Sequence, residues 1–134
     1  MLSWKTSTQH PRGTMEIEGN AHRTPPTVVV RVAGHGTVDM VEVLDTALER
    51  MHRDHPSFRL FYDLERLSGY DTAAREAIAE HSPRWEPMVG SHRTTLLVQS
   101  RVVAMGISIV SMVRGRSYLV FTDRASWERQ IVGR

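Results

Sequence analysis

A neighbouring carboxylate and hydroxyl, Asp71 and Thr72, have the clearest chemical potential in this chain. They stand in the stretch "FYDLERLSGYDTAAR" (Phe61 to Arg75), whose pattern predicts a strand, a short loop and a helix that begins at the pair. A helix N-terminus carries unpaired N–H groups and a partial positive charge. The Thr72 hydroxyl can therefore cap the helix, or it can carry a phosphate that these groups stabilise. The sequence leaves both roles open.

The other polar residues give weaker indications of chemistry. His52 and His55 lie where a helix is predicted to end, and no second cluster of metal ligands accompanies them. His35 stands between two glycines in a strand-to-helix turn, a pattern that favours a tight turn over a nucleotide loop. The chain has neither a G-x-S-x-G nor an H-E-x-x-H signature. We therefore expect no enzymatic activity, no cofactor and no metal.

The composition is typical of one globular domain. The chain has 134 residues, of which 40% are hydrophobic and 24% charged, and it contains no cysteine. No apolar run approaches the roughly 20 residues that cross a bilayer, and the first residues do not have the pattern of a signal peptide. We expect a cytoplasmic protein with a single domain over residues 15–134. Residues 1–14 are predicted to form a flexible N-terminal arm, with an irregular edge strand as the alternative.

The charge distribution is uneven but has no binding signature. The net charge is +2, and the basic residues are one lysine and sixteen arginines. Seven of these arginines fall in residues 93–134, so this third of the chain could meet an acidic partner, although solvated helix faces explain the same charges. No lysine run or arginine–aromatic stripe is present. We expect neither nucleic-acid binding nor membrane binding.

Hydrophobic patterning predicts alternating strands and helices. Alternating or β-branched runs predict strands over residues 15–19, 27–34, 58–64, 94–100 and 117–121. Helical spacing and caps predict helices from 37 to about 52, from about 73, over 101–113 and over 123–132. The first two strands can pair as a hairpin. The order β-β-α-β-α-β-α-β-α then implies an α/β domain with a mostly parallel or mixed sheet of about five strands and about four helices.

The helix predicted from Arg101 to Val113 is apolar nearly all round, so it must be buried on every side or cover a partner. One interpretation is a self-association surface that makes a homodimer, and another is one wall of an apolar ligand cavity. The residues concerned are Val102, Met105, Ile109 and Met112. Burial under the N-terminal arm or the Trp85 segment is the third alternative.

The order of elements, together with the stretch that contains Asp71 and Thr72, resembles the STAS domain. This is the SpoIIAA-like fold of bacterial anti-sigma-factor antagonists, and the chain is more loosely similar to STAS/SEC14-type single-domain proteins. The resemblance covers about residues 15–132. It places the strand end at Tyr62-Asp63-Leu64, the loop at Leu67-Ser68, and the pair at Asp71-Thr72. The chain departs from the family at Ala73-Ala74-Arg75, where a small residue and Gly-Leu usually follow the pair.

The resemblance implies a bacterial signalling module that is not an enzyme and binds an anti-sigma-factor or kinase-like protein. Thr72 is then the candidate phosphosite, and the partner-binding residues are Ser68, Asp71, Thr72 and Arg75. The SEC14-type side of the resemblance implies instead a domain that binds a lipid or another apolar small molecule. A homo-oligomeric structural component is the remaining interpretation.

Overall fold

The computed structural model describes residues 3–89, 93–99 and 119–132. In chain order the elements are β1 (Ser3–His10), β2 (Gly13–Asn20), β3 (Thr27–Gly36), α1 (Val38–Asp54), β4 (Arg59–Tyr70), α2 (Thr72–Trp85), β5 (Thr94–Val98), β6 (Leu119–Phe121) and α4 (Arg124–Val132). The predicted helix over 101–113, with Val102, Met105, Ile109 and Met112, lies outside the described residues. The α/β class is confirmed, with six strands and three helices in the described part of the chain.

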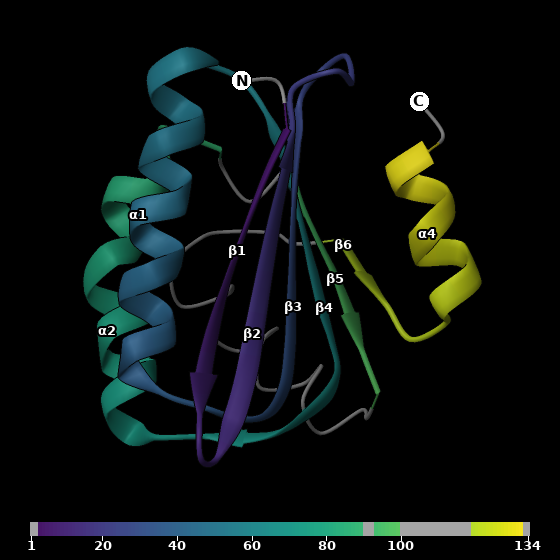
Figure 1. Ribbon diagram of the computed structural model, residues 1–134. Coiled ribbons are helices and arrows are strands. Elements are labelled where there is room, and N and C mark those ends of the chain that lie inside the picture. Colours follow the sequence, from purple (N-terminus) through teal and green to yellow (C-terminus); the bar gives the residue numbers. More distant parts are fainter. Residues whose placement is uncertain (1–2, 90–92, 100–118, 133–134) are drawn as a thin grey trace.

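One mixed sheet holds the six strands in the order β1-β2-β3-β4-β5-β6. The pairs β1–β2 and β2–β3 are antiparallel, and the pairs β3–β4, β4–β5 and β5–β6 are parallel. Figure 1 shows α1 and α2 on one face of this sheet and α4 on the other. The predicted mostly parallel or mixed sheet is confirmed, and so is the predicted hairpin, which is the pair β2–β3.

The apolar run in β3 divides the core between the two faces. Val28 and Val30 pack in the larger cluster with residues of α1 and α2, whereas Val29 packs in the smaller cluster beneath α4. Successive side chains of a strand point to opposite faces, so an unbroken apolar run is typical of a strand covered on both sides. In the smaller cluster the fully buried Trp127 meets Phe61 edge-on, with ring centroids 6.2 Å apart.

The helices follow the predicted periodicity. α1 buries Val41, Leu44, Leu48 and Met51 along one face, which is the spacing of an amphipathic helix. α2 starts at Thr72, one residue before the predicted start, and includes Pro83 near its end. No helix among the residues described here combines the length and the apolar character needed to cross a membrane.

The structure corrects the expectation of a flexible N-terminal arm and agrees with the alternative, an edge strand. Ser3–His10 forms the edge strand β1, which pairs with β2 along all eight residues. The segment "SWKTSTQH" is polar, and only the regular alternation of exposed and half-buried positions marks it as a strand. Hydrophobic runs therefore do not predict this edge strand, in which Trp4 is the only large apolar side chain.

The predicted loop at Leu67-Ser68 is also wrong. Both residues belong to β4, which continues to Tyr70. The pairing with β3 nevertheless skips Ser68, because Gly34 pairs with Leu67 and His35 pairs with Gly69. Such irregularities bend a strand and redirect the side chains that follow. The irregularity therefore lies just before the residues of chemical interest.

Ion pairs around Asp63 tie α4 to the sheet. The Arg124 guanidinium donates to Asp63 at 2.8 Å and to Glu65 at 2.7 Å, and Arg31 donates to Asp63 at 3.1 Å. Hydrogen bonds to Asp63 and Glu65 raise the pKa of Arg124 above its ordinary value. A buried carboxylate requires such partners, so α4 supplies what the buried Asp63 needs.

Replacing Leu48 by alanine should lower the free energy of unfolding by about 2–5 kcal/mol, because truncation of a buried side chain leaves a cavity. Leu48 is 0% exposed and Leu119 is 51% exposed. The matched change Leu119→Ala should therefore lower the free energy by less than about 1 kcal/mol. Urea unfolding followed by circular dichroism measures both values, and equal losses at the two positions would contradict the placement of the core.

Candidate functional site

Three segments meet at the edge of the sheet where α1 and α2 begin. The parallel strands β3 and β4 end there, and the Asp71 N–H donates to the Gly36 carbonyl at 3.0 Å. The turn between β1 and β2 reaches the same edge, at the lower end of Figure 1. We call Arg12, His35, Asp71 and Thr72 the corner cluster. Its members come from a turn, from β3 and from the start of α2.

A close backbone approach positions Arg12. The His35 N–H donates to the Arg12 carbonyl at 2.9 Å, which fastens the β1–β2 turn to the end of β3. Gly34 has a φ of +83°, and a Cβ atom there would lie 2.7 Å from the Arg12 carbonyl oxygen. Glycine tolerates this backbone conformation and leaves room for the carbonyl. The turn, and with it Arg12, therefore depends on a glycine at this position.

The Asp71 carboxylate is held by two partners from distant parts of the chain. Its Oδ1 atom lies 2.7 Å from His35 Nε2 and 2.9 Å from the Arg12 guanidinium. A carboxylate can only accept, so His35 donates through Nε2. The hydrogen bond from His35, joined by the charge of Arg12, holds the pKa of Asp71 below its ordinary value despite an opposing effect of desolvation. Asp71 therefore stays ionised through the physiological range.

These contacts divert Asp71 from the usual role of its position. Asp71 is the N-cap of α2, with extended backbone angles that suit a cap, but its side chain makes no capping hydrogen bond. Asp123 provides the contrast, because its carboxylate accepts from the Ser126 N–H at 3.1 Å in the first turn of α4, as the sequence predicts. The carboxylate of Asp71 thus binds Arg12 and His35 instead of the first amides of α2.

The predicted partner-binding residues are all at least partly accessible to solvent. Ser68, Thr72 and Arg75 are exposed, and Asp71 is half-buried. Thr72 is the first residue of α2, and its hydroxyl has no hydrogen bond within the described residues. The alternative that Thr72 is itself the cap is therefore not what the structure has, since the cap position belongs to Asp71.

Sequence reasoning missed several residues of this surface. Arg12 carried no signal, and His35 was interpreted only as part of a tight turn. Tyr70 is 49% exposed and Val38 is 37% exposed, and they lie at the end of β4 and the start of α1. Two exposed apolar side chains next to a polar cluster are a feature of protein-binding surfaces. Their position at strand and helix ends was the available signal.

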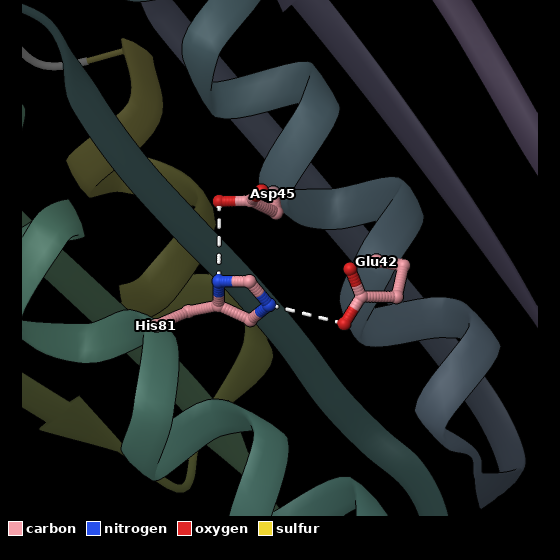
Figure 2. Close-up of side chains that lie close together, drawn as sticks. All are labelled: Glu42, Asp45 and His81. Atoms are coloured by element: carbon pink, nitrogen blue, oxygen red, sulfur yellow. Dashed lines mark hydrogen bonds and ion pairs between the residues drawn. The ribbon is translucent and has the colours of Figure 1, made fainter.

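A second polar cluster joins α1 to α2. Figure 2 shows the His81 ring between the carboxylates of Glu42 and Asp45. Its Nε2 atom lies 3.0 Å from Glu42, and its Nδ1 atom lies 3.6 Å from Asp45. The ring also stacks on Trp85, with an interplanar angle of 9°. One histidine and two carboxylates can hold a metal ion, so Glu42, Asp45 and His81 are candidate metal ligands.

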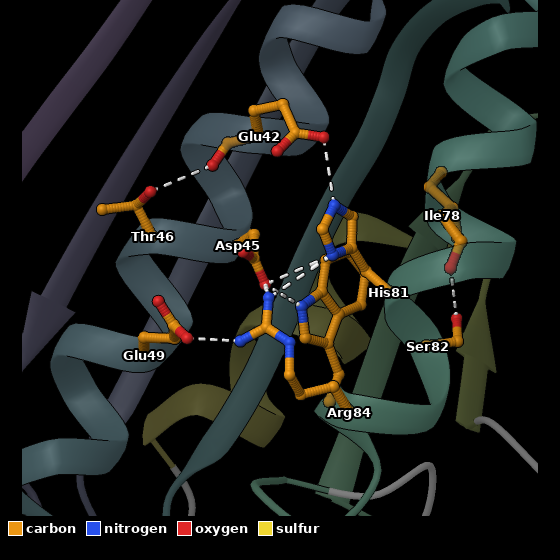
Figure 3. Close-up of polar contacts among 9 residues, drawn as sticks. Glu42, Asp45, Thr46, Glu49, Ile78, His81, Ser82 and Arg84 are labelled. Atoms are coloured by element: carbon orange, nitrogen blue, oxygen red, sulfur yellow. Dashed lines mark hydrogen bonds and ion pairs between the residues drawn. The ribbon is translucent and has the colours of Figure 1, made fainter.

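Arg84 already supplies the cation in this second cluster. Its guanidinium pairs with Asp45 and Glu49 and comes within 3.4 Å of His81 Nδ1, as Figure 3 shows. A metal ion shared by Asp45 and His81 would have to displace Arg84, so the arrangement is an ion-pair seam between two helices. His52 and His55 join no group of potential metal ligands in the part of the chain that the structure describes.

Asp45 is the buried centre of this seam. Burial alone would raise its pKa, but the hydrogen bonds from Arg84 and Trp85, together with the charges of Arg84 and His81, outweigh that effect and lower the pKa. The Trp85 Nε1–H donates to Asp45 at 2.7 Å. The seam thus fixes where α2 lies against α1, and with it the direction of the helix that starts at Thr72.

A hollow on the same face of the molecule has little capacity for a ligand. Its volume is about 220 Å³, below the roughly 300–1,000 Å³ of most small-molecule sites. The residues that line it are Trp4, Ala21, Arg50, Met51, Asp54 and His55. Three of these six, Arg50, Asp54 and His55, are charged or carry an imidazole. The described part of the chain therefore gives no support to an apolar ligand cavity at this place.

Comparison with known proteins identifies the fold. No protein-family model and no curated protein sequence matches the chain. The structure is similar to an uncharacterised protein of the DUF3478 family with a SpoIIAA-like fold from Shewanella loihica PV-4, with a TM-score of 0.68 and 12% identity over 92% of this chain and 97% of that one.

Two proteins of stated function also share the architecture. The anti-sigma factor antagonist SpoIIAA in its unphosphorylated form has a TM-score of 0.56 and 16% identity over 96% of this chain and 97% of that one. An anti-sigma factor antagonist from Mycobacterium paratuberculosis has a TM-score of 0.52 and 11% identity, over 97% and 94% respectively. The chain has the SpoIIAA-like fold of STAS domains, as the resemblance predicts, and at these identities the likeness concerns the fold alone.

Replacing Gly34 by alanine should destabilise the protein by on the order of 2 kcal/mol, because a side chain at positive φ is strained and would strike the Arg12 carbonyl. Gly69→Ala is the matched control, since a Cβ atom there would make an ordinary contact of 3.5 Å with His35. Thermal unfolding compares the two variants. A Gly34→Ala protein as stable as Gly69→Ala would show that the turn does not need glycine.

The ion pairs between α1 and α2 should make the free energy of unfolding depend on pH. The pKa of Asp45 is lower in the folded protein than its ordinary value of 3.8, so the unfolded chain takes up the proton first as the pH falls. Its stabilising effect is therefore complete above about pH 5 and is lost progressively as the pH falls below about 4, through the lowered pKa of the folded protein. The difference in free energy of unfolding between wild type and Asp45→Asn, measured with urea, should be largest near neutral pH and should shrink steadily as the pH falls below about 4. A difference that is constant over this range would exclude the ionised carboxylate as its source.

Proposed function

We propose that this protein is a non-catalytic regulatory module that binds another protein through the surface around the corner cluster and is switched by phosphorylation of Thr72. Two proteins with the same fold are anti-sigma factor antagonists, and the form of one of them is specified as unphosphorylated. This supports a partner of the anti-sigma-factor or kinase-like class. The fold alone does not assign a function, so the proposal depends on the local surface.

The position of Thr72 carries the proposal. Its hydroxyl is exposed on the first residue of α2, and the carboxylate that would normally cap the helix is engaged by Arg12 and His35. A phosphate on Thr72 would lie beside N–H groups that no side chain caps, at the positive end of the helix dipole. Such a group would be stabilised where it forms while it changes the surface charge.

The chemistry of the switch belongs to the partner. In the transfer, Thr72 Oγ1 attacks the γ-phosphorus of a nucleoside triphosphate held by a kinase, the hydroxyl proton passes to a base of that kinase, and the nucleoside diphosphate leaves as the bond from its β-phosphate oxygen to the γ-phosphorus breaks. The target must therefore reach into another active site, which an exposed helix start permits. A nucleoside-triphosphate-dependent switch also supports the cytoplasm as the location.

Phosphorylation should weaken a complex formed at this surface. Tyr70 and Val38 are exposed apolar side chains at the same edge of the sheet, and a partner that covers them would also cover Thr72. A phosphate adds a charge of about −1.5 to −2 near neutral pH. Burying this charge in an interface costs the free energy of its hydration, so the unmodified protein is the form that binds.

The same geometry supports a binding role over a catalytic one. The His35–Asp71 pair resembles two parts of a nucleophile–base–orienter arrangement. Within the described residues, however, no hydroxyl forms a hydrogen bond to His35, whose recorded side-chain partner is Asp71. A general base with no nucleophile hydrogen-bonded to it has no proton to abstract for acyl transfer, so we assign His35 the role of a hydrogen-bond donor to Asp71.

A charge at position 72 should abolish partner binding, whereas loss of the hydroxyl alone should not. We expect affinity capture from the source cell, read by quantitative mass spectrometry, to recover an anti-sigma-factor or kinase-like protein with wild type and Thr72→Val but not with Thr72→Glu. Thr46→Glu makes the same change at an exposed position of α1 and should keep the partner. A phosphopeptide that contains Thr72 is expected from the same cells.

Identical partners for wild type, Thr72→Glu and Thr46→Glu would overturn the switch, as would a Thr72 peptide that is always unmodified during growth and stress.

Tyr70 should contribute to the interface. Tyr70→Ser removes an exposed aromatic ring, and such rings are common hot spots whose loss weakens binding by about 10-fold or more. Leu119→Ser is the matched control, because Leu119 is exposed to the same extent, 51% against 49%, on a different edge of the sheet. Calorimetric titration with the captured partner compares them. Equal effects of the two substitutions would place the interface elsewhere.

A further inference from the structure

Two basic side chains from outside α2 contact the residue that precedes Thr72. Arg12 and His35 converge on the carboxylate of the residue immediately before Thr72. They arrive from positions 59 and 36 residues away in the chain, so helix formation does not account for them. Local helix chemistry would instead favour a free Asp71 that caps the first turn, as Asp123 does in α4.

The two side chains differ in their freedom to move. The Arg12 side chain is 54% exposed, whereas that of His35 is 23% exposed and packs near Gly69. The Arg12 backbone is fastened by the hydrogen bond from the His35 N–H. The guanidinium can therefore change partner without displacement of the turn, while the imidazole is confined to Asp71.

A phosphate on Thr72 would compete for Arg12. It offers three acceptor oxygens and about twice the charge of a carboxylate, and an arginine binds phosphate in a two-pronged geometry. The two anions on adjacent residues would also repel each other unless a cation lay between them. Arg12 has the charge and the exposure for this position, and its guanidinium already contacts the residue that precedes Thr72.

We propose that Arg12 is the receptor of the Thr72 phosphoryl group: its guanidinium leaves Asp71 for the phosphate, while His35 keeps Asp71 in place. This inference rests on the proposed function, because it specifies how the modified state is stabilised. When Arg12 changes partner, the β1–β2 turn contacts the start of α2 through the phosphate on Thr72 instead of through Asp71. The switch then alters the surface of the hairpin turn as well as the charge at Thr72.

The test uses full-length protein prepared with phosphothreonine at position 72, so that it needs neither a cellular kinase nor a partner. Phosphorus NMR follows the second ionisation of the phosphate, whose ordinary pKa is about 6. A bound arginine favours the dianion and lowers this pKa. We expect the Arg12→Gln protein to titrate about half a pH unit higher than wild type. Arg53→Gln, which removes the same charge at the far end of α1, should titrate like wild type.

Arg75 provides the decisive comparison, because it is an exposed arginine in the first turn of α2. Should Arg75→Gln produce the shift and Arg12→Gln none, Arg75 would be the receptor and the proposal would be wrong. Equal titration of Arg12→Gln and Arg53→Gln would also overturn it. An absence of Thr72 phosphorylation in cells would count against the proposed function alone, since this titration does not depend on it.

The role of His35 is tested with the same phosphorylated protein. His35→Ala removes the hydrogen bond to Asp71. We expect phosphorylation to lower the melting temperature of His35→Ala by a few degrees more than that of wild type, because no side chain then holds Asp71 once Arg12 has left it for the phosphate. The same change in both proteins would show that His35 does not hold Asp71 in the modified state.

Discussion

Parallel pairing between β3 and β4 is the constraint on which the rest of the molecule depends. Because the two strands are parallel, their carboxyl ends lie at the same end of the sheet. The helices that follow them, α1 and α2, therefore start side by side and return over the same face. The hydrogen bond from Asp71 to Gly36 closes this edge. The antiparallel hairpin β1–β2 then brings its turn to the same place, and Arg12 with it. The corner cluster is thus a consequence of topology, since Arg12, His35 and the pair Asp71-Thr72 come from three separate stretches of the sequence.

A buried carboxylate fastens a helical layer on each face of the sheet. Asp45 joins α1 to α2 through Arg84 and Trp85, and Asp63 joins the sheet to α4 through Arg124. Each carboxylate loses hydration on burial, and its partners restore hydrogen bonds and charge balance. Apolar packing alone tolerates small shifts between layers, whereas such pairs require one arrangement. Contacts at the C-terminal end of α2 therefore contribute to the direction in which the helix leaves the corner.

Much of the fold could be predicted from the sequence, and most of the corner could not. Apolar periodicity located α1, and the β-branched run that contains Val28, Val29 and Val30 located β3. β1 was predicted only as the alternative to a flexible arm, because its polar composition suits an edge strand and a loose arm equally well. Asp71 and Thr72 were found from their place before a helix. Arg12 and His35 could not be found, because contacts across 59 and 36 residues depend on strand order and register, which the local pattern does not contain.

The diverted cap gives the corner its physical meaning. A capping side chain is worth about 0.5–2 kcal/mol to a helix, and α2 forgoes this contribution although an aspartate occupies the position. α4 shows that the same residue type caps in this protein when nothing competes for it. Departures from local stability rules concentrate at functional sites, where geometry serves a purpose other than folding. Two basic side chains that hold Asp71 aside leave uncapped amides and an unbonded Thr72 hydroxyl together at the surface, and this arrangement suits the anionic modification that we propose.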